Sequence, residues 1–254
     1  MKWHRMATAF RMSLNMLLRR RIVLIALTLI PLIFLSVVQL TAAEKVIRFQ
    51  LASLDEPTYV ELVQRGISLI FFSVTTTGFL TSFLALNLIQ LDFEVNRRLV
   101  ICGYHPVELL LSKVMLLLLI TGVMATYLAI LIYSLYPIEH FGGYVLGLAM
   151  IGFVYGCYGL AIGSVIHGEL EGIFLIVLLA NIDVGWVQNP VFFADAQNRE
   201  MIKYLPGYFP SQSAIISALT DYSALNARLN SLLYGAGFLC ISMFCSYKQL
   251  QKHC

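Results

Sequence analysis

Six stretches of the chain are long enough and apolar enough to cross a lipid bilayer as single helices. A helix rises about 1.5 Å per residue, so about 20 apolar residues cover a hydrocarbon core of roughly 30 Å. The predicted spans, in chain order, are Ile22 to Leu40, Ile67 to Leu91, Leu109 to Tyr136, Tyr144 to Ile166, Gly172 to Val187 and Leu229 to Tyr247. This pattern predicts an all-α membrane protein in which residues 1–254 form a single membrane domain.

The composition agrees with lipid as the surrounding solvent. The 254 residues are 59% hydrophobic and 12% charged, which is more apolar surface than the interior of a soluble domain could bury. A dispersed net charge of +3 makes no basic stripe for nucleic acid, and the five cysteines include no C-x-x-C pair. We expect no nucleic-acid partner and no metal or other cofactor held by this chain itself.

Basic residues predict the orientation, because cytoplasmic flanks are enriched in Lys and Arg. The first 21 residues carry six basic side chains and no acid. With the N-terminus inside, six crossings bring the C-terminus to the same side, which then holds eleven of the seventeen basic residues. We expect a multi-pass plasma membrane protein with both termini in the cytoplasm, whose first span is a retained anchor and not a cleaved signal peptide.

Residues 1–21 show two faces at helical spacing. Apolar side chains occupy one face and polar side chains the other, respectively Met6, Phe10, Leu14 and Leu17, and Thr8, Arg11, Asn15 and Arg19. The pattern predicts an amphipathic helix lying along the inner membrane surface. The alternative is a basic orientation signal alone.

A charged segment, residues 92–108, interrupts the apolar sequence between the second and third spans. Glu94, Arg97 and Arg98 stand at near-helical spacing, Gly103 permits a break, and Pro106 is suited to the first turn of the next helix. We expect a short helix on the cytoplasmic face that docks another protein. The alternative is a basic loop with no partner.

The order of residues in and after this segment resembles the six-helix permeases of ATP-binding-cassette (ABC) exporters of the ABC-2 type. The residues that carry the resemblance are Glu94, Arg97, Gly103, Pro106 and Lys113, together with the N-terminal helix, the six spans and the Tyr204–Pro210 stretch YLPGYFP. The resemblance implies that residues 92–108 are a coupling helix seated on an ABC ATPase. It also implies two ATPase subunits and a second permease chain, identical or homologous.

ATP and Mg²⁺ would then reach the complex only through the ATPase. This chain has no G-x-x-x-x-G-K-[ST] phosphate loop, since none of its glycines is followed by lysine. We therefore expect a transport subunit and not an enzyme.

The second span carries a stripe of hydroxyls, which we call the hydroxyl stripe, formed by Ser73, Thr77 and Thr81 at i, i+4 and i+8. In the resembled family this span lines the substrate path, so these residues are candidates for lining it. The alternative is that each hydroxyl bonds back to its own helix and allows close packing.

Asn181 and Asp183 in the fifth span are also candidates for the path or gate, because a carboxylate at membrane depth is costly without water, protein or a counter-charge around it. An outer interfacial position is the alternative for Asp183.

The fourth span pairs Gly152 with Gly156 and Gly159 with Gly163 as G-x-x-x-G, which predicts close helix packing.

Residues 188–228 contain only short apolar pieces, none able to cross the bilayer alone. We expect re-entrant helices capping the outer mouth, with Pro206 and Pro210 at an outer gate, or else a folded outer loop.

The functional hypothesis is a permease that exports a drug, antibiotic, lipid, peptide or glycan. The alternatives are a secondary transporter or a non-transporting membrane scaffold.

Overall fold

The computed structural model describes residues 3–50, 59–90, 93–166 and 168–252. In chain order the elements are α1 (Trp3–Arg19), α2 (Arg21–Thr41), β1 (Val46–Gln50), β2 (Tyr59–Val63), α3 (Gln64–Gln90), α4 (Phe93–Ile101), α5 (Pro106–Leu135), α6 (Phe141–Val165), α7 (Glu169–Ala180), the π-helix η1 (Asn181–Val187), α8 (Pro190–Asp195), α9 (Arg199–Lys203), α10 (Tyr208–Leu219) and α11 (Leu225–Lys252).

Six helical segments of the described chain are long and apolar enough to cross a membrane. They are α2, α3, α5, α6, the continuous segment from α7 through η1, and α11. Each of them overlaps one of the predicted spans. The prediction of six long apolar helices is confirmed, and they are consistent with a multi-pass, mainly helical membrane protein.

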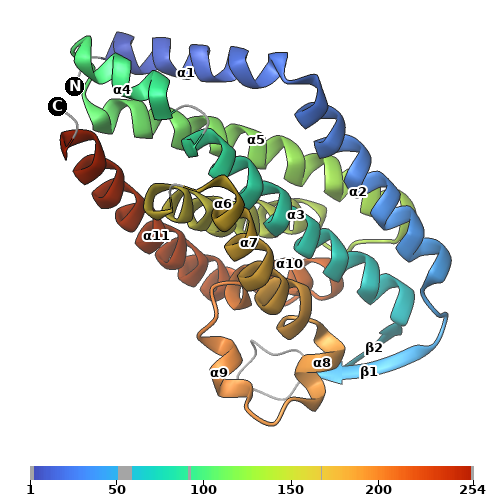
Figure 1. Ribbon diagram of the computed structural model, residues 1–254. Helices are drawn as coiled ribbons and strands as arrows, with labels where there is room; N and C mark the ends of the chain where they lie inside the picture. Colours follow the sequence, from blue (N-terminus) through green and yellow to red (C-terminus); the bar gives the residue numbers. More distant parts are fainter. Residues whose placement is uncertain (1–2, 51–58, 91–92, 167, 253–254) are drawn as a thin grey trace.

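The two ends of the described chain lie at the same end of the helical bundle. Figure 1 shows both termini beside α4, whereas the β-strands, α8 and α9 lie at the opposite end. An even number of membrane crossings would give this arrangement. The segment predicted to dock a partner therefore shares one end of the molecule with both termini.

The expectation of an all-α fold misses a pair of strands between α2 and α3. β1 and β2 run antiparallel, with Val46 opposite Val63 and Arg48 opposite Glu61. Their sequences, VIRFQ and YVELV, are rich in β-branched and aromatic residues, which favour extended backbone. The pair belongs to the end of the molecule that also carries α8 (Figure 1).

The two predicted faces of the N-terminal helix are present in α1. Met6 and Leu17 are buried, whereas Arg11 and Arg19 are exposed. The buried face packs on α5, and the chain bends at Arg20 before it enters α2 (Figure 1). The helix is therefore amphipathic, and its place at a membrane surface stays a prediction.

α6 is the central helix of the bundle, with α3, α5, α10 and α11 packed around it. Its glycines allow these contacts. A Cβ atom at Gly159 would lie 2.3 Å from the carbonyl oxygen of Ser82 in α3, and one at Gly147 would lie 2.5 Å from Cα of Ala214 in α10. The predicted role of the α6 glycines in close helix packing is confirmed.

We expect Gly159→Ala to lower the free energy of unfolding by about 1–3 kcal/mol, because its methyl group would overlap the backbone of α3. Thermal unfolding of the purified protein in detergent measures the change. Gly122→Ala is the matched control, since no atom lies within 4 Å of a Cβ at Gly122. Equal unfolding temperatures for the two variants would contradict this account of the contact between α3 and α6.

Candidate functional site

The predicted docking segment forms a short helix and a tight turn. α4 ends at Ile101, and Gly103 follows with φ of +87°, a left-handed conformation that glycine adopts without strain. The Gly103 amide donates to the Val100 carbonyl at 2.9 Å, and the Tyr104 amide donates to the Leu99 carbonyl at 3.0 Å. These two bonds form a Schellman motif, which ends α4 in a defined geometry.

The next helix begins two residues after this turn. Pro106 is the first residue of α5, and His105 Nδ1 accepts a hydrogen bond from the Val107 amide at 3.3 Å. The sequence prediction for Gly103 and Pro106 as a break and a restart is confirmed. Their part in coupling to an ATPase stays a prediction.

The charged residues of α4 are described unequally. Arg98 is exposed. Glu94 and Arg97 belong to α4, but their side chains lie outside the described part of the structure, as does all of Asp92. Among the charged side chains of α4, Arg98 is the one that the structure describes as exposed.

α1 holds the turn after α4. The Arg5 guanidinium donates to the Gly103 carbonyl at 2.5 Å, and its Cζ lies 5.5 Å from the centre of the Tyr104 ring. The sequence analysis missed both residues in this role, because Arg5 is 98 positions away from Gly103. The contact joins the N-terminal helix to the segment between α4 and α5.

Lys113 lies inside the bundle and not in the loop. It is 2% exposed, and its Nζ donates to the carbonyl oxygen of Leu88 near the C-terminal end of α3. A helix C-terminus leaves carbonyls without helical partners, and a cation there is favourable. Lys113 therefore ties α5 to α3, at a position within the predicted third span Leu109 to Tyr136.

The hydroxyl stripe is buried between helices. Thr77 Oγ1 donates to the Ser73 carbonyl and Thr81 Oγ1 to the Thr77 carbonyl, each at 2.7 Å, and Ser73 Oγ lies 2.5 Å from the Tyr144 hydroxyl. A Cβ at Gly152 would lie 3.2 Å and 3.4 Å from Cγ2 of Thr81 and Thr77. These contacts agree with the alternative in which the hydroxyls bond back to their own helix and allow close packing. A lining role in another conformation stays a prediction.

The two polar residues of the fifth span have different surroundings. Asn181 is exposed, whereas Asp183 is 5% exposed. Both belong to η1, where the helix widens and its backbone hydrogen bonds shift. Thr75 Oγ1 in α3 donates to the Val184 carbonyl of η1 at 3.1 Å, which supplies a partner at this irregular point.

Three hydrogen-bond donors converge on the Asp183 carboxylate. The Tyr155 hydroxyl and the Gly207 amide both donate to Oδ2, the latter at 2.8 Å, and Gln188 Nε2 donates to Oδ1 at 2.9 Å. No basic side chain of the described residues pairs with it. These bonds join η1 to the middle of α6 and to the residue that precedes α10. We call this group the Asp183 cluster.

The sequence analysis found Asp183 but not its partners. Gln188 follows five residues later and belongs to the same stretch, so a local signal existed. Tyr155 and Gly207 are 28 and 24 positions away, and only the packing of α6 and α10 against η1 brings them to the carboxylate. A role of the cluster in a path or gate stays a prediction.

The predicted re-entrant segment, residues 188–228, contains α8, α9 and α10. At 12 residues, α10 is about 18 Å long and too short to cross a bilayer. It begins beside the Asp183 cluster, with Pro206 in the preceding turn and Pro210 buried in its first turn. At its other end, the Ser217 carbonyl accepts from the His140 amide at 3.1 Å.

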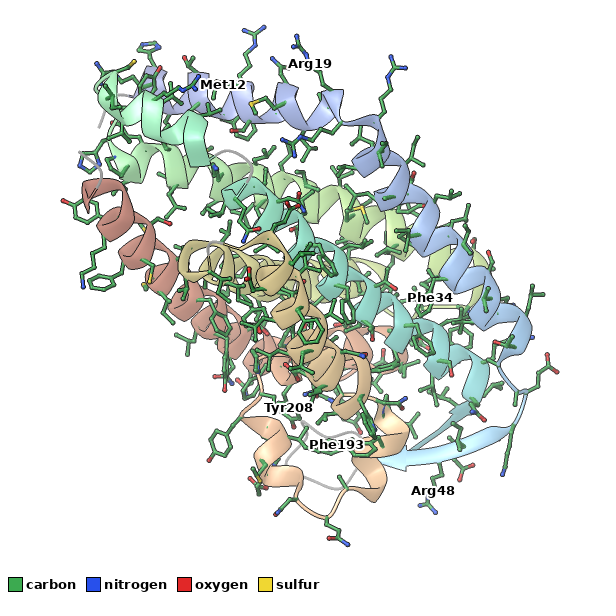
Figure 2. The ribbon with its side chains drawn as sticks, viewed as in Figure 1. Met12, Arg19, Phe34, Arg48, Phe193 and Tyr208 are labelled. Carbon is green, nitrogen blue, oxygen red and sulfur yellow. The ribbon has the colours of Figure 1, made fainter. Side chains whose placement is uncertain are left out.

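Aromatic side chains pack where α8 and α10 meet. The ring centroids of Phe193 and Tyr208 are 6.1 Å apart, and both residues lie at the α8–α9 end of the molecule (Figure 2). Burial, with a smaller contribution from the charge of Glu200, raises the pKa of Tyr208 to about 12. Its hydroxyl therefore stays protonated at physiological pH. A gating role for Pro206 and Pro210 is untested by this geometry.

No protein-family model matches the chain, and no curated protein is significantly similar to it.

We expect Asp183→Leu to destabilise the fold by about 2–5 kcal/mol, because it leaves three donors without an acceptor in a buried site. Asp183→Asn should stay close to wild type. Its single oxygen can replace Oδ2, and the Gln188 amide can flip to accept from the new NH₂ group. Thermal unfolding in detergent compares the two variants. If Asp183→Leu unfolded at the wild-type temperature, the cluster would not hold α10 in place.

Proposed function

We propose that this chain is the membrane-spanning permease subunit of an ABC exporter of the ABC-2 type. It would act as two permease chains with two ATPase subunits, and ATP with Mg²⁺ would bind the ATPase alone. The observation that carries the proposal is the position of α4. This nine-residue helix shares one end of the bundle with both termini, presents the exposed Arg98, and continues through a capped turn into a span.

The contacts around α4 suit it to transmitting a movement. Its turn is bound by Arg5 of α1, and α5 is tied to α3 through Lys113. A displacement of α4 by a closing ATPase pair would therefore reach α1, α3 and α5 together. Helices that move as a group can switch a path between inward-facing and outward-facing states.

The proposal also assigns the orientation. The end with α4 and the termini would face the cytoplasm, as the excess of Lys and Arg on that side suggests. The end with β1, β2, α8 and α9 would face outward, with α10 as a re-entrant helix. The membrane would be a plasma membrane, such as the bacterial inner membrane.

A secondary transporter is the second candidate, and the Asp183 cluster favours it. Ion-coupled transporters use acidic residues buried at membrane depth beside discontinuous helices. Here Asp183 lies in a π-helix beside the first residues of a half-length helix. Transport driven by an imposed proton or sodium gradient without ATP, and abolished in Asp183→Asn, would favour this candidate.

We expect Arg98→Gln to reduce the amount of ATPase that copurifies with the chain at least tenfold, which corresponds to the loss of a charge-assisted hydrogen bond. The measurement is affinity purification of the tagged chain from its own cells, followed by quantification of proteins with a phosphate loop. Lys248→Gln is the matched control, because it removes an exposed positive charge from α11 at the same end of the bundle.

Two outcomes would contradict the proposal. One is a purified chain that transports at full rate without any ATPase subunit. The other is an ATPase that copurifies equally with the wild type and with Arg98→Gln, which would leave α4 a topological marker.

A further inference from the structure

A half-open apolar groove lies where α1 and α2 meet α3. Its volume is about 280 Å³, and α1, α2 and the second half of α3 line it. Leu17, Leu27, Leu84 and Leu88 form its apolar wall and belong to one buried cluster. The groove is therefore lined by well-packed side chains and is not a gap between loose ones.

The groove extends along α2 over the depth of one membrane leaflet. Its lining includes Arg20 at the beginning of the helix and Ile30 ten residues later, a distance of about 15 Å along the axis. Half of a hydrocarbon core measures roughly the same. Ile22, Ile25 and Ile30 on α2 are at least half exposed, as expected for a helix that faces lipid.

Positive charge marks one end of the groove. Arg20 lines it there, with Ser13 on one side, and Arg19 and Arg21 are its chain neighbours. No hydrogen bond or ion pair joins the Arg20 guanidinium to another described residue. The first acid of the sequence is Glu44, beyond the far end of α2.

We propose that this groove binds a phospholipid with an anionic headgroup, which we call the groove lipid. One acyl chain lies along α2 and α3, and the headgroup phosphate pairs with Arg20. The guanidinium presents two donors to phosphate oxygens in a plane, which suits it to this role.

The position of the groove lipid gives it a structural effect. It would fill the space between the bend at Arg20 and α3, and so fix the angle at which α1 leaves the bundle. α1 in turn holds the turn after α4 through Arg5. The inference needs only a membrane location, and it stands whether or not the chain works with an ATPase.

The test is lipid retention by the full chain. Protein reconstituted with equal amounts of palmitoyl-oleoyl phosphatidylglycerol and phosphatidylcholine is released into detergent, and native mass spectrometry counts the lipids that remain bound. We expect phosphatidylglycerol to be retained in preference. Arg20→Gln should reduce that preference about fivefold, as for the loss of one basic contact with an anionic lipid.

Arg11→Gln is the control for general surface charge, because Arg11 is exposed on α1 and does not line the groove. A second pair tests the apolar part. Ala26→Phe fills the groove and should reduce retention at least threefold, whereas Ile25→Phe places the same ring on a lipid-facing side of α2 and should not. Thermal unfolding of each variant shows whether it is folded. If Ala26→Phe is not folded, the comparison of Arg20→Gln with Arg11→Gln decides the test.

Three results would overturn the proposal. An equal loss of the preference for phosphatidylglycerol in Arg20→Gln and Arg11→Gln would mean that the lipid is attracted to the charged surface alone. Unchanged retention in folded Ala26→Phe would place the lipid elsewhere. A dimer species lost in Ala26→Phe, with retention unchanged, would mean that a second copy of the chain occupies the groove.

Discussion

Lipid offers no hydrogen bonds, and this constraint accounts for the contacts of several buried polar groups in the described part of the chain. Hydroxyls of the second span donate to carbonyls of their own helix. Lys113 donates to the Leu88 carbonyl in the last turn of α3. The Asp183 carboxylate accepts from Tyr155 in α6, from Gly207 before α10 and from the nearby Gln188. An unpaired polar group in hydrocarbon costs several kcal/mol. The fold therefore requires these contacts, because without them the buried polar groups would destabilise it.

The same constraint explains the importance of the α6 glycines. The donors that reach Asp183 come from α6 and from the start of α10, so these helices must approach η1 closely. Gly147 lets α10 lie against α6, and a Cβ atom at Gly78 in α3 would lie 3.6 Å from side-chain atoms of both Tyr155 and Val184. Small residues thus bring the backbones together, and the polar contact at Asp183 follows from that approach. Packing and polar satisfaction are coupled in this part of the molecule.

The two ends of the bundle differ in chemistry. The end with α4 combines exposed Arg98, the basic bend after α1 and a turn fixed by Arg5. The opposite end is built from a strand pair, short helices and packed aromatic rings such as Phe193 and Tyr208. A permease that docks an ATPase on one side and closes a path on the other needs such an asymmetry. The basic bend would also supply the charge for the proposed groove lipid.

The sequence by itself determined the features that depend on neighbouring residues. These are the six spans, the two faces of α1, and the break at Gly103 before Pro106, because helical periodicity, left-handed backbone and proline geometry act over a few positions. Only the tertiary structure decided that Arg5 binds Gly103, that Lys113 is buried, and that Tyr155 and Gly207 meet at Asp183. Those partners are 24 to 98 positions apart. These contacts depend on which helices pack together. Apolar periodicity predicts which face of a helix is buried, but not which other helix packs against that face.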